Sequence, residues 1–234
     1  MKAVNKLMIF ASVAVAAVAI PVFAGDSDNR SEMTKKLTRA EAVLKASLAA
    51  PDKGIPKDAL EKAECVGVFP DVKKAAFVVG GQGGEGVFTC RDASGKMGAP
   101  AFFNIAGGSV GWQFGGQETD LVLLVMNKNG MSHLLEDKFT IGAEATATAG
   151  PVGRTAKAAT DAQLNAQILS WSRSQGAFIG AALDGSVVAP DKDKNKDLYG
   201  ANATARSILM ENSVQTPSEA ASYVKTVNAN TTRG

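Results

Sequence analysis

The segment Asp120-Leu-Val-Leu-Leu-Val-Met126 is apolar at every position after its first residue. A short apolar run bounded by turn residues is typical of a strand that is buried on both faces. Similar runs, beginning with Cys65-Val-Gly-Val-Phe69, recur through residues 64–190 and are separated by glycines and turn signals such as Asn127-Lys-Asn-Gly130. These connections are too short for crossover helices. We therefore predict an α+β domain with a mainly antiparallel sheet, sandwich- or barrel-like.

Helices are expected at both ends of this β-rich core. Residues 31–50 carry an apolar stripe at spacings of three and four, which predicts an amphipathic helix that ends before Pro51. Two further helical pieces are expected within 201–227, at 201–211 and 217–227. The expected strands are Cys65–Phe69, Ala75–Gly80, Gly86–Arg91, Ala101–Ile105, Ser109–Phe114, Asp120–Met126, Met131–Leu135, Thr140–Thr148, Ile168–Ser174 and Ala177–Ala189.

The first 24 residues have the layout of a secretory signal peptide. Lys2 and Lys6 form a basic start, an uncharged run follows to Ile20, and small residues precede a cleavage point after Ala24. The alternative is an uncleaved membrane anchor, since about 18 apolar residues can just span a bilayer. The alanine-rich run and its small-residue ending favour the signal. We therefore expect residues 25–234 to be a single periplasmic or secreted domain.

Removal of the signal changes the charge balance. The chain has 25 basic and 23 acidic residues, and Lys2 and Lys6 leave with the signal, so the remainder is balanced at 23 of each. A neutral domain lacks the surplus of cations that non-specific nucleic-acid binding requires. Cys65 and Cys90 are the only two cysteines. In an exported chain they form either a disulfide or two buried thiols.

Two motifs invite a ligand interpretation and do not sustain it. Gly81-Gln-Gly-Gly-Glu-Gly86 matches a dinucleotide fingerprint, but the β-prone run Val87–Cys90 stands where the fingerprint needs a helix. A glycine-rich bend between strands fits better. In Asp191-Lys-Asp-Lys-Asn-Lys-Asp197, side chains that carry oxygen stand at alternate positions, as at the start of a calcium-binding loop. However, Lys196 occupies the position where such a loop has glycine, and Asn202 occupies the position of its last glutamate. A solvated charged loop is the better interpretation.

Catalytic chemistry has little support in the sequence. His133 is the single histidine, and it lies within an apolar run where no nearby set of residues supplies a nucleophile together with an oriented base. One histidine and two distant cysteines also lack the close ligand pairs of zinc sites. We therefore expect no catalytic residue, no metal and no cofactor, and we treat an enzyme as the weaker alternative.

The predicted N-terminal helix has two interpretations. Its stripe can dock on the domain core, which is the commoner fate of amphipathic helices. It can instead enter a membrane interface while its basic side chains face anionic head groups. The residues concerned are the apolar Met33, Leu37, Leu44 and Leu48 and the basic Lys35, Lys36, Arg39 and Lys45.

The stretch from Cys65 to Tyr199 resembles the SYLF domain, a lipid-binding module of exported bacterial proteins and of eukaryotic endocytic proteins. The landmarks occur in order: Val66-Gly-Val-Phe-Pro70, Phe77-Val-Val-Gly-Gly81, Gly84-Glu-Gly-Val87, Pro100-Ala-Phe-Phe103, Gly111-Trp-Gln-Phe-Gly115, Asp120-Leu-Val-Leu-Leu124, Gly150-Pro-Val-Gly-Arg154, Ser170-Trp-Ser-Arg-Ser-Gln-Gly176, Phe178-Ile-Gly180 and Asp197-Leu-Tyr-Gly200. The chain departs in having Trp171 where many relatives have tyrosine.

This resemblance implies binding to membrane phospholipid through a basic surface and the N-terminal helix. It adds Arg154 and Arg173 as secondary lipid-binding candidates, because both lie in matched motifs, although either can be a structural ion-pair partner. Some eukaryotic members also bind actin, which an exported chain does not meet. We therefore expect non-enzymatic binding of anionic phospholipid. The alternative is an envelope structural or protein-interaction module that does not bind lipid directly.

Overall fold

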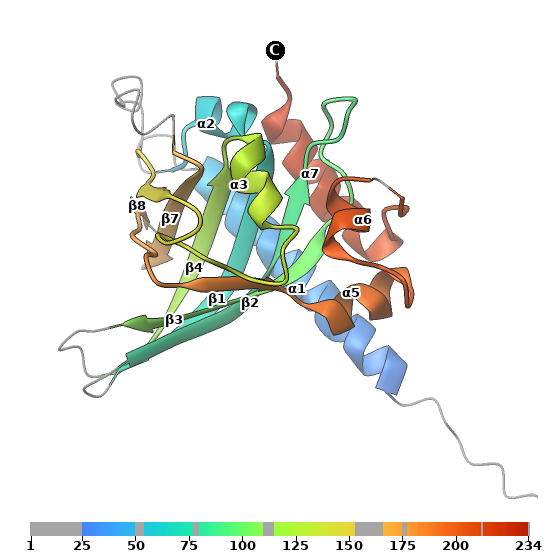
Figure 1. Cartoon of the computed structure of the whole chain (residues 1–234), viewed down its shortest axis with the longest axis horizontal. Helices are drawn as coiled ribbons and strands as arrows, with labels where there is room; N and C mark the ends of the chain where they lie inside the picture. The colour runs from blue at the N-terminus through green and yellow to red at the C-terminus, as the bar shows by residue number, and fades with distance from the viewer. Residues whose placement is uncertain are drawn as a thin grey trace, which may run out of the picture.

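The computed structural model describes residues 25–49, 54–76, 80–109, 115–152, 166–174, 177–211 and 213–233. These residues form one curled nine-stranded sheet in the order β5-β9-β3-β2-β1-β4-β7-β6, with β8 also paired to β7 (Figure 1). The pairs are antiparallel except β6 with β7. The strands are β1 (Cys65–Ala76), β2 (Gly80–Cys90), β3 (Ala101–Ser109), β4 (Gly115–Val125), β5 (Phe139–Thr140), β6 (Ala147–Ala149), β7 (Ile168–Ser174), β8 (Ala177–Gly180) and β9 (Val187–Pro190).

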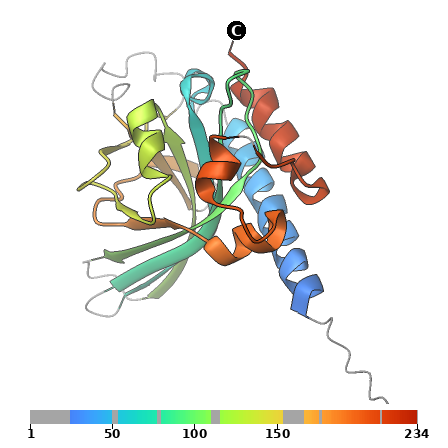
Figure 2. The same ribbon diagram turned by 45° about the vertical axis from the view of Figure 1, so that its right-hand side comes forward.

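Helices cover both faces of this half-barrel. The long helix α1 and the last helix α7 lie side by side on one face, and α3 and α6 lie on the other (Figure 2). The helical elements are α1 (Gly25–Leu48), α2 (Lys57–Lys62), α3 (Lys128–His133), α5 (Lys192–Tyr199), α6 (Ala205–Leu209), the 3-10 turn η2 (Ser218–Ala220) and α7 (Ala221–Thr231). The predicted α+β class with a mainly antiparallel, barrel-like sheet is confirmed, and helices lie at both ends of the chain as expected.

The two helix layers explain why the central strands are apolar at successive positions. Successive side chains of a strand point to opposite faces of the sheet. In β4, Val122 and Leu124 pack in the cluster under α1 and α7, whereas Leu121 and Leu123 pack in the cluster under α3 and α6. Both faces of β4 are therefore buried over residues 121–125, as the apolar run 121–126 predicts.

The glycine-rich motif lies inside β2 and not in a bend between strands, which corrects that expectation. A Cβ atom on Gly86 would lie 2.4 Å from the carbonyl oxygen of Val68 and 2.5 Å from the ring of Phe69. One on Gly84 would lie 2.8 Å from Val72. These positions need glycine because the neighbouring strand β1 lies too close to β2 here to leave room for a side chain. Since β2 continues to Cys90 without a helix, the dinucleotide interpretation is excluded.

Several predicted elements are wrong in type. The expected strand Met131–Leu135 lies largely in helix α3, whose cap is Asn127: its side chain accepts from the amide of Gly130 at 2.9 Å. The expected charged loop at 191–197 is the capped start of α5, where the side chain of Asp191 accepts from the amide of Lys194 at 3.0 Å. Asp191 is thus committed to a helix cap, and among the described residues no cluster of three potential metal ligands exists.

Two other strand predictions hold in part. The expected strand Thr140–Thr148 divides into β5 and β6, and Ala177–Ala189 divides into β8 and β9. The short helix α2 was not predicted. The signal segment 1–24 and most of the predicted strand Ser109–Phe114 lie outside the described residues.

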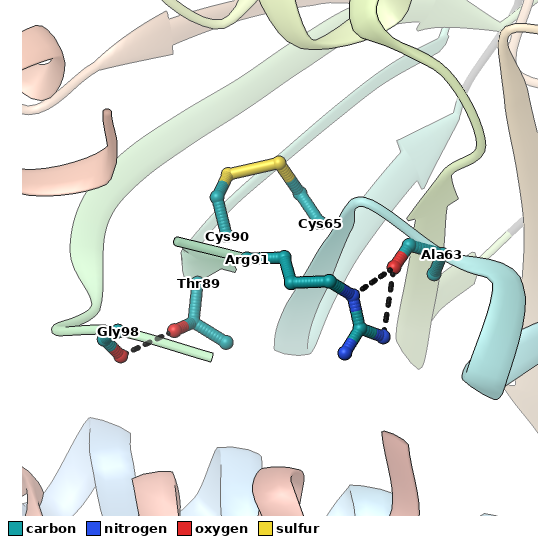
Figure 3. The surroundings of a disulfide bond; sticks show 6 residues. All are labelled: Ala63, Cys65, Thr89, Cys90, Arg91 and Gly98. Carbon is teal, nitrogen blue, oxygen red and sulfur yellow. Dashed lines mark hydrogen bonds between the residues drawn. A yellow bond between two sulfur atoms is a disulfide. The ribbon is translucent and has the colours of Figure 1, made fainter. Parts of the chain in front are cut away.

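Cys65 and Cys90 form a disulfide, which is one of the two alternatives that the sequence left open. They stand opposite each other in the β1–β2 register with their Cα atoms 4.0 Å apart, and both are buried (Figure 3). The alternative of two free thiols is excluded. The bond joins the start of β1 to the end of β2, so it crosslinks the two strands at the end of the sheet next to α2.

Arg91 follows the disulfide and is buried beside it (Figure 3). Its guanidinium donates to the carbonyls of Ala63 at 3.1 and 3.2 Å, Thr231 at 2.9 Å, Glu61 at 3.2 Å and Gly95 at 2.6 Å. Glu61 and Thr231 lie at the C-terminal ends of α2 and α7, where the helix dipole is negative. Arg91 therefore ties both helix ends to the sheet.

Candidate functional site

The apolar stripe of α1 is docked on the sheet. Met33 and Leu37 are each 1% exposed, Leu44 is fully buried, and Leu48 packs against the same cluster. Met33, Leu37 and Leu44 are not available to a membrane while α1 is docked, and Leu48 is partly buried, so the structure does not support the expectation that these side chains insert. The structure therefore agrees with the first of the two interpretations, in which the stripe of this helix packs on the domain core.

Polar contacts to α7 and η2 hold α1 in place. The buried carboxylate of Glu41 accepts hydrogen bonds from Ser222 Oγ at 3.0 Å and Thr226 Oγ1 at 2.9 Å, and it pairs with Lys45 Nζ at 2.6 Å. Burial by itself raises the pKa of Glu41, but the bonds from Lys45, Ser222 and Thr226 together outweigh it and lower that pKa. Glu41 is therefore ionised and clamps the two helices.

The opposite side of α1 presents its four predicted basic residues to solvent in two separate groups. Lys35 and Lys36 make no ion pair with the described residues, and Arg39 pairs with Asp71 on β1. Lys45 lies two turns further along, held by Glu41, and does not line the groove described next. Lys35, Lys36 and Arg39 thus form one local basic group, and Lys45 belongs to the clamp.

A groove of about 590 Å³ runs beside this basic group. Two charged side chains from other elements also line the groove: Glu85 of β2 and Lys194 of α5, which form an ion pair at 2.6 Å. Met33 and Phe102 add apolar surface. The groove is lined by Glu32, Met33, Thr34, Lys35, Lys36, Thr38, Arg39, Glu85, Phe102 and Lys194.

The chemistry of this groove suits binding. Its lining contains no histidine or cysteine, and its two hydroxyls are engaged within α1: Thr34 donates to the carbonyl of Arg30 and Thr38 to that of Thr34. The lysine ammonium and guanidinium groups are charged donors suited to phosphate or carboxylate oxygens. His133 is elsewhere, on α3, with Nδ1 3.1 Å from Glu136.

Arg173 belongs to a different structure. Its guanidinium is 3.3 Å from Asp120 and stacks over the ring of Phe178, with 5.7 Å between Cζ and the ring centroid. Asp120 also accepts from the amide of Asp71 at 3.2 Å. Arg173 is thus an ion-pair partner on the sheet and does not line the groove. Arg154, the other secondary candidate, lies outside the described residues.

Sequence reasoning found the α1 side of the groove and missed the rest. Glu85, Phe102 and Lys194 come from three elements that are distant in sequence, and no spacing pattern connects them to α1.

As for membrane spans, no helix among the described residues combines the length and apolarity needed to cross a bilayer.

An antiparallel half-barrel with a docked amphipathic helix and a charged groove beside it defines a binding domain. Residues 106–230 match the family model Ysc84, described as Las17-binding protein actin regulator, and the chain belongs to this family. The resemblance to SYLF domains is thereby confirmed.

Named relatives extend the match over most of this chain. It is 32% identical over 184 residues to LAS seventeen-binding protein 3 of Saccharomyces cerevisiae, covering 75% of this chain and 40% of the relative. It is 29% identical over 185 residues to SH3 domain-containing YSC84-like protein 1 of Homo sapiens, covering 76% of this chain and 54% of the relative. The chain thus spans only about half, or less, of the length of these relatives.

Proposed function

We propose that the chain is exported and binds anionic phospholipid at a membrane surface without catalysing a reaction. The observation that carries this proposal is the pair Lys35 and Lys36. They stand on the exposed side of a docked helix, beside an open groove, and make no ion pair with the described residues. Two unneutralised ammonium groups at one place are a local attraction for head groups on a domain whose overall charge is balanced.

The attraction is electrostatic, because the apolar stripe is occupied by the core. Each lysine near an anionic surface contributes about 1 kcal/mol. Arg39 adds to this attraction, since an exposed ion pair such as its pair with Asp71 is worth only about 0–1 kcal/mol and can exchange partners at a charged surface. Lys45 adds less, because it is paired with the buried carboxylate of Glu41. Binding of this kind is weak, reversible and sensitive to salt.

Export has two supports. Residues 1–24 have the layout of a secretory signal. The Cys65–Cys90 disulfide is of a kind that forms and persists in oxidising compartments such as the periplasm or the extracellular space.

A second candidate is an envelope or protein-interaction module whose basic helix does not meet lipid. The docked stripe favours it, and the description of the family names binding to another protein. Under this alternative, reversing the charges of α1 leaves vesicle binding unchanged, and cross-linking through the same residues captures a protein.

Vesicle co-sedimentation separates the two. The purified exported chain is mixed with phosphatidylcholine vesicles, with or without phosphatidylglycerol, at low and high salt. We expect binding only to the phosphatidylglycerol vesicles, weakened by salt and abolished in the variant Lys35→Glu/Lys36→Glu. The matched control is Lys128→Glu/Lys138→Glu, which has the same charge change on exposed lysines near α3, on the other face of the sheet. Failure to sediment with either vesicle type would refute lipid binding, and equal sedimentation with both would refute the preference for anionic phospholipid.

A further inference from the structure

The groove beside α1 carries both signs of charge. Lys35, Lys36, Arg39 and Lys194 line it together with two carboxylates, Glu32 and Glu85. Glu32 is exposed and makes no ion pair with the described residues. Glu85 pairs one carboxylate oxygen with Lys194 Nζ at 2.6 Å, and its second oxygen accepts no hydrogen bond from the described residues.

This mixture of charges matches a zwitterionic ligand better than a purely anionic one. A purely anionic ligand would satisfy Lys35 and Lys36 but would meet like charges at Glu32 and Glu85. A zwitterion that carries a phosphate and an amine fits both signs at once. Its phosphate would accept from Lys35 and Lys36, and its ammonium would donate to the carboxylates of Glu32 and Glu85.

We propose that this groove binds the phosphoethanolamine head group of a membrane phospholipid. This inference rests on the proposed function, because it assumes that α1 faces a lipid surface, and it names the head group that the surface presents to the groove. The volume of about 590 Å³ accommodates one such head group, and Met33 and Phe102 provide an apolar wall for the methylene and glycerol carbons.

Phosphocholine is the decisive comparison. It carries the same charges as phosphoethanolamine, but its nitrogen bears three methyl groups and has no hydrogen to donate. A carboxylate can attract it and cannot hydrogen-bond to it. Charge alone therefore treats the two head groups alike, whereas hydrogen bonding to Glu32 and Glu85 prefers phosphoethanolamine.

The first experiment measures co-sedimentation with vesicles of constant phosphatidylglycerol content in which phosphatidylcholine is replaced by phosphatidylethanolamine. We expect the partition coefficient to rise about threefold, in keeping with exposed charged hydrogen bonds. If the chain binds both vesicles equally, this inference is wrong and the proposed function stands.

Two variants of equal charge test the assignment to the groove. Glu85→Gln frees Lys194 and makes the surface more basic, so it should strengthen binding to phosphatidylglycerol while it reduces the preference for phosphatidylethanolamine, and Glu85→Gln combined with Glu32→Gln should abolish that preference. Glu118→Gln neutralises an exposed carboxylate of β4 that does not line the groove, and it should keep that preference. A preference that survives Glu85→Gln combined with Glu32→Gln would overturn the proposal.

A soluble probe keeps the test independent of the membrane. Glycerophosphoethanolamine, glycerophosphocholine and glycerophosphoglycerol are titrated while amide NMR signals of residues 32–39 and of Glu85 are followed. We expect saturable shifts at these signals with the lowest midpoint for glycerophosphoethanolamine. If these saturable shifts occur although the chain binds no vesicles, the head-group site is supported and the proposed binding to a membrane surface is refuted. Equal responses to the ethanolamine and choline compounds would overturn the site.

Discussion

Replacing Arg91 with methionine should destabilise the domain more than any exposed substitution. Arg91 is 7% exposed, and its guanidinium serves the carbonyls of Glu61, Ala63, Gly95 and Thr231. Methionine is of similar length and preserves much of the packing, but it has no donor. The buried carbonyls then lose their partner, and the ends of α2 and α7 lose the cation that stabilises their dipoles.

The expected loss follows from these bonds. A buried acceptor left without a donor costs about 1–3 kcal/mol. The bonds to the carbonyls of Ala63 and Thr231 are buried, whereas those to Glu61 and Gly95 are partly exposed to water and count for less. Part of the loss is offset because methionine does not incur the desolvation of a buried charge, which already lowers the pKa of Arg91. We expect a net loss of about 3–4 kcal/mol in the free energy of unfolding.

Urea denaturation followed by the fluorescence of the buried Trp171 measures this loss, with the disulfide intact in every sample. Arg91→Lys should recover about half of the stability, since an ammonium group has three donors and lacks the planar fork. Arg206→Met is the matched control, because Arg206 is exposed and, among the described residues, its guanidinium donates only to the sulfur of Met210. A loss below about 1 kcal/mol in Arg91→Met would show that the carbonyls find water and that the reasoning fails.

Three further predictions concern the sheet and the clamp. Cys65→Ala/Cys90→Ala should lose about 3.5 kcal/mol, because the bond closes a loop of 25 residues, and thermal unfolding of the reduced wild-type chain should show a similar loss. Gly86→Ala should lose about 1–3 kcal/mol from its clash with Val68, whereas Gly81→Ala, whose new Cβ has no neighbour closer than 3.9 Å, should lose much less. The lowered pKa of Glu41 means that the clamp stabilises fully above the unfolded-state pKa and is lost as pH falls through the folded-state pKa, so acid unfolding of wild type should show a pH dependence that Glu41→Gln reduces.

The sheet was predictable because its signal is local. The apolar run 121–126 and its neighbours indicated strands buried on both faces, and the disulfide was one of two alternatives that the residues left open. The errors also have local causes. The run Met131–Leu135 is too short for its period to distinguish a strand from a helix. Asn127 signals a turn in the sequence, and the structure uses the same side chain to cap α3.

The site was predictable only on the side that lies on one helix. Helical spacing places Lys35, Lys36 and Arg39 together, because neighbours on a helix are three or four residues apart. Glu85 and Lys194 reach the same groove through the pairing of β2 with β3 and the docking of α5 on α1. Such proximity depends on the tertiary fold, and a single sequence does not contain a pattern for it.

The packing of α1 against α7 also has a consequence for the order in which the chain folds during its synthesis. Glu41 and Ser222, which join the two helices, are 181 positions apart in the sequence. While the chain is being made, α1 exists long before the helix that completes its cover. During that interval the stripe of Met33, Leu37 and Leu44 lacks the part of its cover that α7 supplies, and apolar surface exposed in this way promotes aggregation. A chain truncated before α7 would keep the sheet on which the stripe packs, but Glu41 would lose its partners Ser222 and Thr226 and one side of α1 would stay uncovered.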